Sequence, residues 1–379
     1  MPEILFVAGE ASGDTNAAGV ARELKAAQAA FELLGVGGDQ MELAGVQLIE
    51  HIRNLAVMGF AGLLTQLPKH WMLLNDLRAR LQSGTVALVI LVDYGGFNLQ
   101  VAAAAKSAGV PVLYYITPQV WASRASRIRN LAATVTKAAV IFKFEEDLLR
   151  ANGVDAVFVG HPMLERAADM PSRTRARESL GIGADRRLLA VFPGSRTQEI
   201  DRHLGPFVET ARLLQAADSQ LDVVVSRAPT VTIDSSRCPF PIVQTSSWTL
   251  LRAADAALCK SGTTTLEAAV AGCPLVIGYR ASPLDYAIAK QIVTIDYIGM
   301  VNVVARRSIV PEFVQDDLDP VRVVPVLSEL LDPSSPRRIE MIAELAKVRA
   351  SLGDSGASSR VAKLALEMAA VRASTQARR

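Results

Sequence analysis

Two short turns rich in glycine and hydroxyl side chains contain the residue types that bind phosphate. The first, Ser261-Gly262-Thr263, lies between an expected strand at 256–259 and an expected helix at 264–271. A helix start presents unpaired backbone N–H groups and the positive end of the helix dipole, and hydroxyl groups add further donors. The second turn, Gly194-Ser195-Arg196, adds a guanidinium, which can form two parallel hydrogen bonds to phosphate oxygens. Both turns are therefore candidate phosphate sites.

Glu267 has two interpretations. It lies one turn beyond Thr263 on the same helix face, where its carboxylate can accept hydrogen bonds from a sugar diol. The run Thr264-Thr265-Leu266-Glu267 also fits a capping box, in which the glutamate satisfies a backbone N–H group and binds no ligand. The residues alone leave both interpretations open.

Asp93 is the candidate general base. It follows an apolar run at 87–92 and precedes Tyr94-Gly95-Gly96. Ligands of open α/β sheets bind at the carboxyl ends of strands, and a carboxylate flanked by glycines can face a cleft there. The spacing by itself favours an ordinary N-cap or turn aspartate over a base.

Three further features also have a functional and a structural interpretation. Arg124 and Arg127 share a helix face and can meet an anionic group, although such pairs are usually solvated. His161 follows a strand end and can reach a cleft, although a lone histidine in a turn is more often structural. The turn at 9–13 lacks the glycine spacing of a dinucleotide fingerprint, and it fits a plain turn as well as a ligand loop.

Composition limits the classes of protein to consider. The chain has 379 residues, of which 50% are hydrophobic, so it suits two domains with substantial cores. A net charge of +2 argues against a nucleic-acid binder. Three cysteines without paired spacing indicate reduced thiols and neither a metal site nor a redox cofactor.

The N-terminal residues contain no basic leader, and the longest strongly apolar run is only strand-sized. We therefore expect a cytoplasmic protein whose membrane contact, if any, is peripheral. One stretch, 57–74, is apolar over most of a helix surface, which indicates either core burial, the commoner case, or contact with lipid.

Strands and helices are expected to alternate, which predicts parallel sheets with right-handed crossovers. The expected strands are 4–8, 31–36, 87–92, 111–116, 138–142, 156–160, 188–192, 221–225, 241–245, 256–259 and 275–279. The expected helices are 14–25, one from about 203, 264–271 ended by Gly272, 320–331 and 339–368. The composition of 166–185 indicates a linker between domains at 1–165 and 186–354.

An ordered set of motifs resembles the lipid-A-disaccharide synthase family over nearly the whole chain. The set comprises AGEASGD (8–14), LAVMG (55–59), DYGGFN (93–98), TPQVWASR, VGHP (159–162), PGSR, SGTTTLE and IGMVNVVARRSIVPEFVQDD. The resemblance implies the GT-B architecture, an α/β fold of two Rossmann-like domains with parallel sheets and an interdomain cleft. It also implies that the C-terminal helix, 355–379, packs back on the first domain.

The same resemblance implies an inverting reaction at the cytoplasmic face of the inner membrane. UDP-2,3-diacylglucosamine would transfer its sugar to 2,3-diacylglucosamine 1-phosphate, without a cofactor or metal, to form the β(1-6) disaccharide 1-phosphate and UDP. Asp93 would be the base, and Arg196 and Asn302 would serve the donor side. The matched motifs place these residues on the acceptor side: Glu10, Ser12, Gly13, Asp14, Met58, Asn98, Arg124, Arg127 and His161.

Two other functions and the assembly state remain open from the sequence. One alternative is another GT-B enzyme that uses a UDP-sugar, such as an N-acetylglucosaminyltransferase or a 2-epimerase. The other is a two-domain nucleotide-sugar-binding protein without catalysis, which the absence of a leader disfavours. The sequence does not decide between a monomer and a homodimer.

Overall fold

The computed structural model describes residues 1–379 except 29, 56–59, 120–124, 284–285, 287–295 and 377–379. The chain divides into two compact units. Unit 1 comprises Met1–Pro162 and Gly353–Arg379, and unit 2 comprises Met163–Leu352. Unit 1 is therefore built from both ends of the chain, and unit 2 from one continuous segment.

Unit 1 is a parallel α/β unit. Its sheet has the order β3-β2-β1-β4-β5-β6-β7, and every neighbouring pair is parallel. The strands are β1 (Glu3–Ala8), β2 (Glu32–Gly37), β3 (Gln47–His51), β4 (Val86–Val92), β5 (Val112–Tyr115), β6 (Lys137–Val140) and β7 (Ala156–Phe158). The helices are α1 (Ala11–Ala26), α2 (Asp39–Leu43), α3 (Phe60–Gln82), α4 (Gly95–Ser107), α6 (Ala125–Thr134), α7 (Lys143–Ala151) and α17 (Ala357–Gln376).

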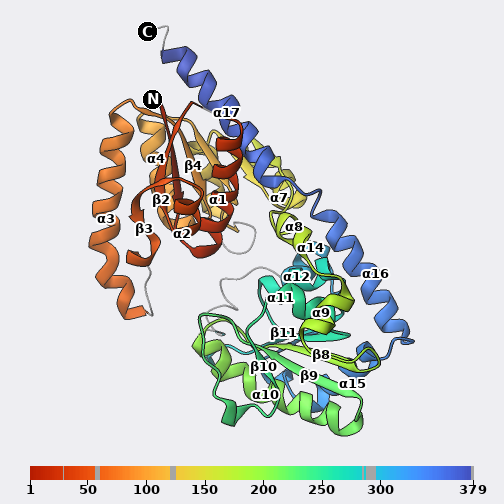
Figure 1. Cartoon of the computed structure of the whole chain (residues 1–379). Coiled ribbons are helices and arrows are strands. Elements are labelled where there is room, and N and C mark those ends of the chain that lie inside the picture. Colours follow the sequence, from red (N-terminus) through yellow and green to blue (C-terminus); the bar gives the residue numbers. More distant parts are fainter. Residues whose placement is uncertain (29, 56–59, 120–124, 284–285, 287–295, 377–379) are drawn as a thin grey trace. The chain divides into compact units, whose positions relative to one another are not determined.

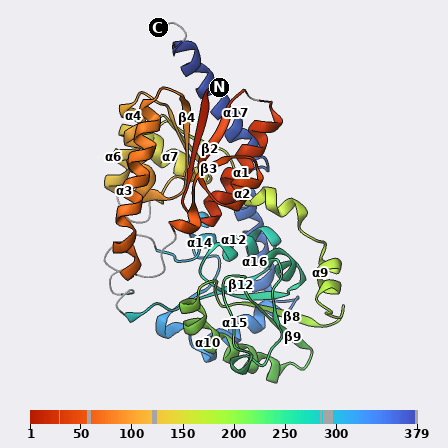
Figure 2. The same cartoon turned by 60° about the vertical axis from the view of Figure 1, so that its left-hand side comes forward.

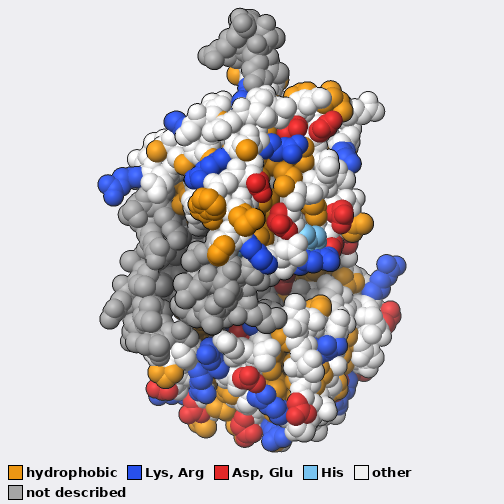
Figure 3. All heavy atoms as spheres, turned by 90° about the vertical axis from the view of Figure 1, so that its left-hand side faces the viewer, with side chains coloured by type: hydrophobic (Ala, Val, Ile, Leu, Met, Phe, Trp, Pro, Cys, Tyr) orange, Lys and Arg blue, Asp and Glu red, His pale blue; other side chains and the backbone are white. Residues whose placement is uncertain are grey.

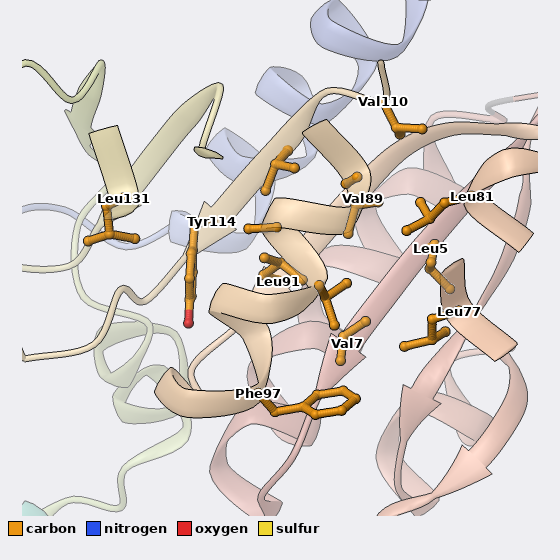
Figure 4. Packing of buried hydrophobic residues seen from close by; sticks show 14 of the residues in the cluster. Leu5, Val7, Leu77, Leu81, Val89, Leu91, Phe97, Val110, Tyr114 and Leu131 are labelled. Carbon is orange, nitrogen blue, oxygen red and sulfur yellow. The ribbon is translucent and has the colours of Figure 1, made fainter. Parts of the chain in front are cut away.

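Helices cover both faces of this sheet, as Figures 1 and 2 show for α3 and α4 on one face and α1 and α17 on the other. This double cover explains why the whole of β4, VALVILV, is buried and apolar. Alternate side chains of β1 and β4 enter the core beneath α3 and α4, among them Leu5, Val7, Val89 and Leu91 (Figure 4).

Unit 2 repeats this architecture with a six-stranded parallel sheet of order β10-β9-β8-β11-β12-β13. The strands are β8 (Arg187–Phe192), β9 (Leu221–Ser226), β10 (Ile242–Val243), β11 (Ala256–Lys260), β12 (Leu275–Tyr279) and β13 (Glu312–Val314). The helices are α8 (Met163–Arg166), α9 (Arg173–Ser179), α10 (Thr197–Ala217), α11 (Ser247–Ala253), α12 (Thr263–Ala271), α14 (Met300–Ala305), α15 (Pro320–Leu331) and α16 (Pro336–Ser351). The two parallel sheets confirm the predicted α/β class.

Several predicted bounds need correction. Residues 166–185 contain α9 and belong to unit 2, where the sequence suggested a linker. Arg177 explains this, because its buried guanidinium donates hydrogen bonds to Ala253 O and Gly183 O within that unit. Helices α1 and α10 begin at Ala11 and Thr197, earlier than predicted, so the loops before them are short. The strands β3 and β13 were not predicted.

The apolar stretch at 57–74 lies partly outside the described residues. From residue 60 onward it belongs to α3, which continues through Pro68 without a break. Leu73 and Leu74 are buried, whereas Trp71 and Met72 are 64% and 60% exposed. Within the described part of the chain, none of the helices combines the length and apolar character required to cross a bilayer.

Candidate active site

Both predicted chemical centres lie where the strand order of a sheet reverses. In unit 1 the reversal is between β1, followed by Gly9, and β4, followed by Asp93. In unit 2 it is between β8, followed by the turn at 194–196, and β11, followed by the turn at 261–262. In doubly wound sheets the crevice outside such a switch point is where ligands bind.

Asp93 is held in an unusual backbone conformation. Asp93 and Tyr94 both have positive φ, 52° and 55°, whereas Gly95 and Gly96 begin α4 with ordinary φ. Left-handed conformation in two consecutive residues other than glycine costs free energy and is concentrated at functional sites. The N-cap of α4 is Tyr94, so Asp93 is not an N-cap, but it lies in the turn between β4 and α4, where its Oδ1 accepts from Tyr94 N.

Two buried side chains fix the Asp93 backbone. The Asn98 Nδ2 donates to Asp93 O at 2.8 Å and to Val7 O at 3.2 Å, which joins the ends of β4 and β1. The Tyr114 hydroxyl also donates to Asp93 O, at 2.8 Å. Asn98 is 0% exposed, so it holds the Asp93 backbone and does not take the acceptor-contact role that the resemblance implied.

The Asp93 carboxylate has the electrostatic environment of a base. Burial raises its pKa, the negative charge of Glu10 raises it further, and the Tyr94 N–H bond to Oδ1 opposes the shift. A raised pKa increases the affinity of a carboxylate for a substrate proton near neutral pH. Glu10 is exposed at the start of α1, so its effect on Asp93 is electrostatic.

Replacing Glu10 with glutamine is expected to move the acidic limb of the kcat/KM profile to lower pH by roughly a few tenths of a unit. The negative charge raises the pKa of Asp93, so its removal lets the base stay deprotonated in more acidic solution. Transfer rates measured across the acidic limb check this. Glu23→Gln, an exposed change on the same helix, is the matched control, and an unmoved limb in Glu10→Gln would contradict the assignment.

Tyr94 explains the glycine that follows β1. A Cβ atom on Gly9 would lie 2.1 Å from the Tyr94 Cγ, so only glycine lets the tyrosine ring pack there. The Tyr94 hydroxyl is 2.5 Å from His70 Nε2, which brings a residue of α3 to the same strand ends. The sequence alone did not predict that Tyr94 and His70 meet, because their pairing depends on tertiary structure.

The other residues expected at the acceptor side differ in how exposed their side chains are. Asp14 is buried, and its carboxylate accepts hydrogen bonds from the backbone N–H groups of Gly38, Gln40 and Met41 at 2.7–3.0 Å. It therefore caps the start of α2 and is not placed to bind an acceptor. Ser12 is exposed on the first turn of α1, and Gly13 is buried behind it.

His161 is buried with its ring centroid 5.2 Å from that of Phe142, as expected of a structural histidine. Three of the predicted acceptor residues cannot be assigned a side-chain position. Met58 and Arg124 lie outside the described residues, and Arg127 is described only as part of the α6 backbone.

The two turns of unit 2 line one pocket of about 400 Å³. Gly194, Ser195 and Arg196 line it from the end of β8, and Ser261, Gly262 and Thr263 line it from the end of β11. The helices α10 and α12 begin directly after these turns, and neither has a side-chain cap. Their first N–H groups are therefore available to an anion. The pocket also includes Glu199, Arg227, Ser247 and Lys260, which the sequence analysis did not select.

The structure rules out one of the two interpretations of Glu267, the capping box. The helix α12 begins at Thr263 with Gly262 as N-cap and without a side-chain cap, so the predicted capping box is absent. Glu267 instead lines the pocket and accepts a hydrogen bond from the Ser247 side chain. Burial raises the pKa of Glu267, which that hydrogen bond partly offsets. The carboxylate is thus available to a ligand such as a diol.

Asn302 is linked to the pocket through a network of hydrogen bonds. Its Oδ1 accepts from Ile309 N and Val310 N, and its Nδ2 donates to Val310 O and to Glu312 Oε1, all within 2.9 Å. This amide is 0% exposed and all its polar groups are hydrogen-bonded within the protein. It therefore does not make the direct contact with a UDP-sugar donor that the resemblance implied.

Glu312 continues this network toward the pocket. Its carboxylate accepts from the N–H groups of Ile298 and Gly299, and Ile298 O accepts from the Ser261 hydroxyl at 2.6 Å. Asn302 and Glu312 therefore position the Ser261 turn.

The comparison with protein families adds the decisive observation. A sequence profile described as lipid-A-disaccharide synthetase matches residues 4–365. The chain belongs to the lipid-A-disaccharide synthase family. The match spans both units and includes both switch-point sites. Members of this family carry the name of a glycosyltransferase, and the chain is an enzyme of that class.

Individual relatives agree with this family. The lipid-A-disaccharide synthase of Myxococcus xanthus (strain DK1622) is 37% identical, with 97% of each chain covered. That of Trichlorobacter lovleyi (strain ATCC BAA-1151 / DSM 17278 / SZ) is 38% identical, with 96% of this chain and 97% of the relative covered.

Solved structures confirm the GT-B fold. A glycotransferase of kitacinnamycin has a TM-score of 0.65 at 16% identity, covering 97% of this chain and 99% of that one. A putative UDP-N-acetylglucosamine 2-epimerase from Listeria monocytogenes has a TM-score of 0.64 at 12% identity, covering 95% and 94%. At such low identity the likeness concerns the fold alone, so it gives no support to an epimerase activity.

Proposed function

We propose that this enzyme transfers the sugar of UDP-2,3-diacylglucosamine to the 6-hydroxyl of 2,3-diacylglucosamine 1-phosphate, with inversion at the anomeric carbon. The observation that carries the proposal is the family match together with one chemical group in each unit that the reaction needs. In unit 1 this feature is the half-buried Asp93 carboxylate. In unit 2 it is the candidate anion pocket lined by the turns at 194–196 and 261–263.

The residues account for the steps of a direct displacement. Asp93 removes the proton from the acceptor hydroxyl as its oxygen forms a bond to the anomeric carbon. The bond from that carbon to UDP breaks, and its electron pair stays on a phosphate oxygen. Backbone N–H groups of the two turns and the Arg196 guanidinium stabilise the developing charge. The Glu267 carboxylate accepts hydrogen bonds from the ribose hydroxyls.

We also propose peripheral contact with the inner membrane through α3, since both substrates carry acyl chains. Trp71 and Met72 are 64% and 60% exposed, and Lys69 and Arg78 lie on the same helix. On the side of unit 1 that carries α3, Figure 3 shows hydrophobic side chains among Lys, Arg, Asp and Glu side chains. Exposed apolar side chains flanked by cations suit the surface of an anionic bilayer.

Replacing Trp71 and Met72 together with serine is expected to reduce sedimentation with phosphatidylethanolamine–phosphatidylglycerol vesicles severalfold, because apolar surface at the interface is lost. Ile339→Ser, which removes a 58%-exposed isoleucine from unit 2, is the matched control and should sediment like the wild type. Equal binding by all three proteins would argue against α3 as the contact.

The wild-type reaction tests the proposed function itself. UDP release and disaccharide formation are measured in detergent from UDP-2,3-diacylglucosamine, with and without 2,3-diacylglucosamine 1-phosphate. We expect both products only when the acceptor is present. UDP release without acceptor, or UDP binding without any disaccharide, would favour a different UDP-sugar enzyme.

A further inference from the structure

The pocket of unit 2 contains a lysine that belongs to neither phosphate-binding turn. Lys260 is the last residue of β11, and its side chain is 19% exposed. A Cβ atom placed on Gly262 would lie 3.7 Å from the Lys260 Nζ, so the ammonium group lies beside the start of α12. Lys260 also lines the pocket together with both turns.

An anionic side chain already occupies the point where the donors of this pocket meet. The Glu199 Oε1 accepts from Lys260 Nζ at 2.8 Å, and its Oε2 accepts from Ser195 N at 2.9 Å. The Arg196 guanidinium lies 3.9 Å from Oε1 and is 80% exposed. A carboxylate thus holds an ammonium group and a turn N–H beside the turns where phosphate oxygens are expected.

We propose that Lys260 binds the diphosphate of the nucleotide sugar and neutralises the charge that forms as UDP leaves, and that Glu199 is its positioning residue. This inference rests on the proposed function and adds a residue to its donor site. No proton transfer is needed at this position, because the electron pair of the broken bond remains on the phosphate oxygen.

The charges of the pocket support this role. Two helix starts supply only about half a charge each and fixed dipoles. A full positive charge at a partly buried position interacts much more strongly with phosphate oxygens. Three cations, Arg196, Arg227 and Lys260, against two carboxylates, Glu199 and Glu267, leave a net positive pocket for an anionic ligand.

Glu199 is suited to position the Lys260 ammonium group. Burial opposes ionisation of Glu199, but hydrogen bonds from Lys260 and Ser195 and the nearby cations lower its pKa overall. The carboxylate is therefore ionised at neutral pH. It also keeps the ammonium group close to the turn, because Glu199 is fixed in the first turn of α10.

A purely structural ion pair between α10 and β11 is the competing explanation, and nucleotides with different numbers of phosphates separate the two. Uridine, UMP and UDP share the base and ribose and differ only in phosphate. If Lys260 binds the diphosphate, its removal weakens UDP selectively. If the pair only shapes the pocket, its loss weakens all three ligands alike.

The test is calorimetric titration of uridine, UMP and UDP into the wild type, Lys260→Gln and Lys260→Arg. A matched control is Lys347→Gln, which breaks a 2.7 Å ion pair with Glu344 elsewhere in unit 2. We expect Lys260→Gln to weaken UDP about tenfold, equivalent to about 1.4 kcal/mol, and to leave uridine unchanged. Lys260→Arg should recover most of this loss, and Lys347→Gln should match the wild type.

Unchanged UDP affinity in Lys260→Gln, or equal losses for UDP and uridine, would overturn the inference and leave the proposed function standing. A wild type that does not bind UDP would overturn the nucleotide-binding part of the proposed function, and this inference with it. Disaccharide formation by the wild type is measured in parallel, so that the two failures are distinguishable.

Discussion

Replacing Asp93 with asparagine is expected to lower kcat about 1000-fold, because the acceptor hydroxyl loses the base that removes its proton. Asparagine can still accept the Tyr94 N–H bond, and the Asp93 backbone is held by Asn98 and Tyr114. The protein should therefore keep its fold. Its affinity for UDP should not change, because Asp93 lies in unit 1 and the turns at 194–196 and 261–263 lie in unit 2. Disaccharide formation and UDP titration measure the two effects separately.

Asp76→Asn provides the control for this change, because Asp76 is an exposed aspartate on α3 in the same unit. It should leave kcat unaltered. Near-normal activity of Asp93→Asn would remove Asp93 from the mechanism, whereas a joint loss of activity and thermal stability would show that the carboxylate has a structural role.

Replacing Gly194 with alanine is expected to weaken UDP binding roughly 30-fold, equivalent to about 2 kcal/mol of backbone strain. Gly194 has φ 138°, which side-chain-bearing residues rarely adopt, and an added Cβ would lie 2.5 Å from Glu199 Cβ. The turn must then move, and with it Ser195 N and the Glu199 carboxylate. Titration with UDP measures the loss.

Gly205→Ala is the matched control, since Gly205 is an exposed glycine within α10 and a Cβ there meets nothing within 4 Å. Alanine in place of glycine inside a helix favours folding by up to about 1 kcal/mol, so this variant should bind UDP normally and melt no lower than the wild type. Equal UDP affinity in both variants would show that the turn conformation does not matter for the nucleotide.

Elements with strong local signals were predictable from the sequence. The strand β12 has the predicted bounds, and Gly272 ends α12 with φ 71°, as its position predicted. The strands β3 and β13 were missed because they are short, lie at sheet edges and are only partly buried, so they lack an apolar pattern. Their pairing comes from neighbouring strands rather than from their own sequence.

The site was predictable as a set of positions but not as a set of roles. Asp14 and Asn98 lie in motifs that follow strand ends, and Asn302 lies in a motif on α14, yet the side chains of all three bind backbone groups. A polar residue that satisfies backbone hydrogen bonds and one that binds a ligand have the same appearance in a sequence. Lys260 and Glu199 were missed because their contact joins distant parts of the chain.

The division of unit 1 between the two ends of the chain has a consequence for biosynthesis. Helix α17 packs against α1 and β4, with Val361, Ala365 and Ala369 fully buried, so the sheet of unit 1 lacks one of its covering helices until α17 has been translated. At a translation rate of roughly 5–20 residues per second, the roughly 190 residues of unit 2 take about 10–40 s to synthesise, and the sheet of unit 1 lacks α17 during that time. Unit 2 is continuous and can close its own core during that time. A premature stop codon before Gly353 would thus leave the apolar sheet surface of unit 1, which is translated first, without its α17 cover.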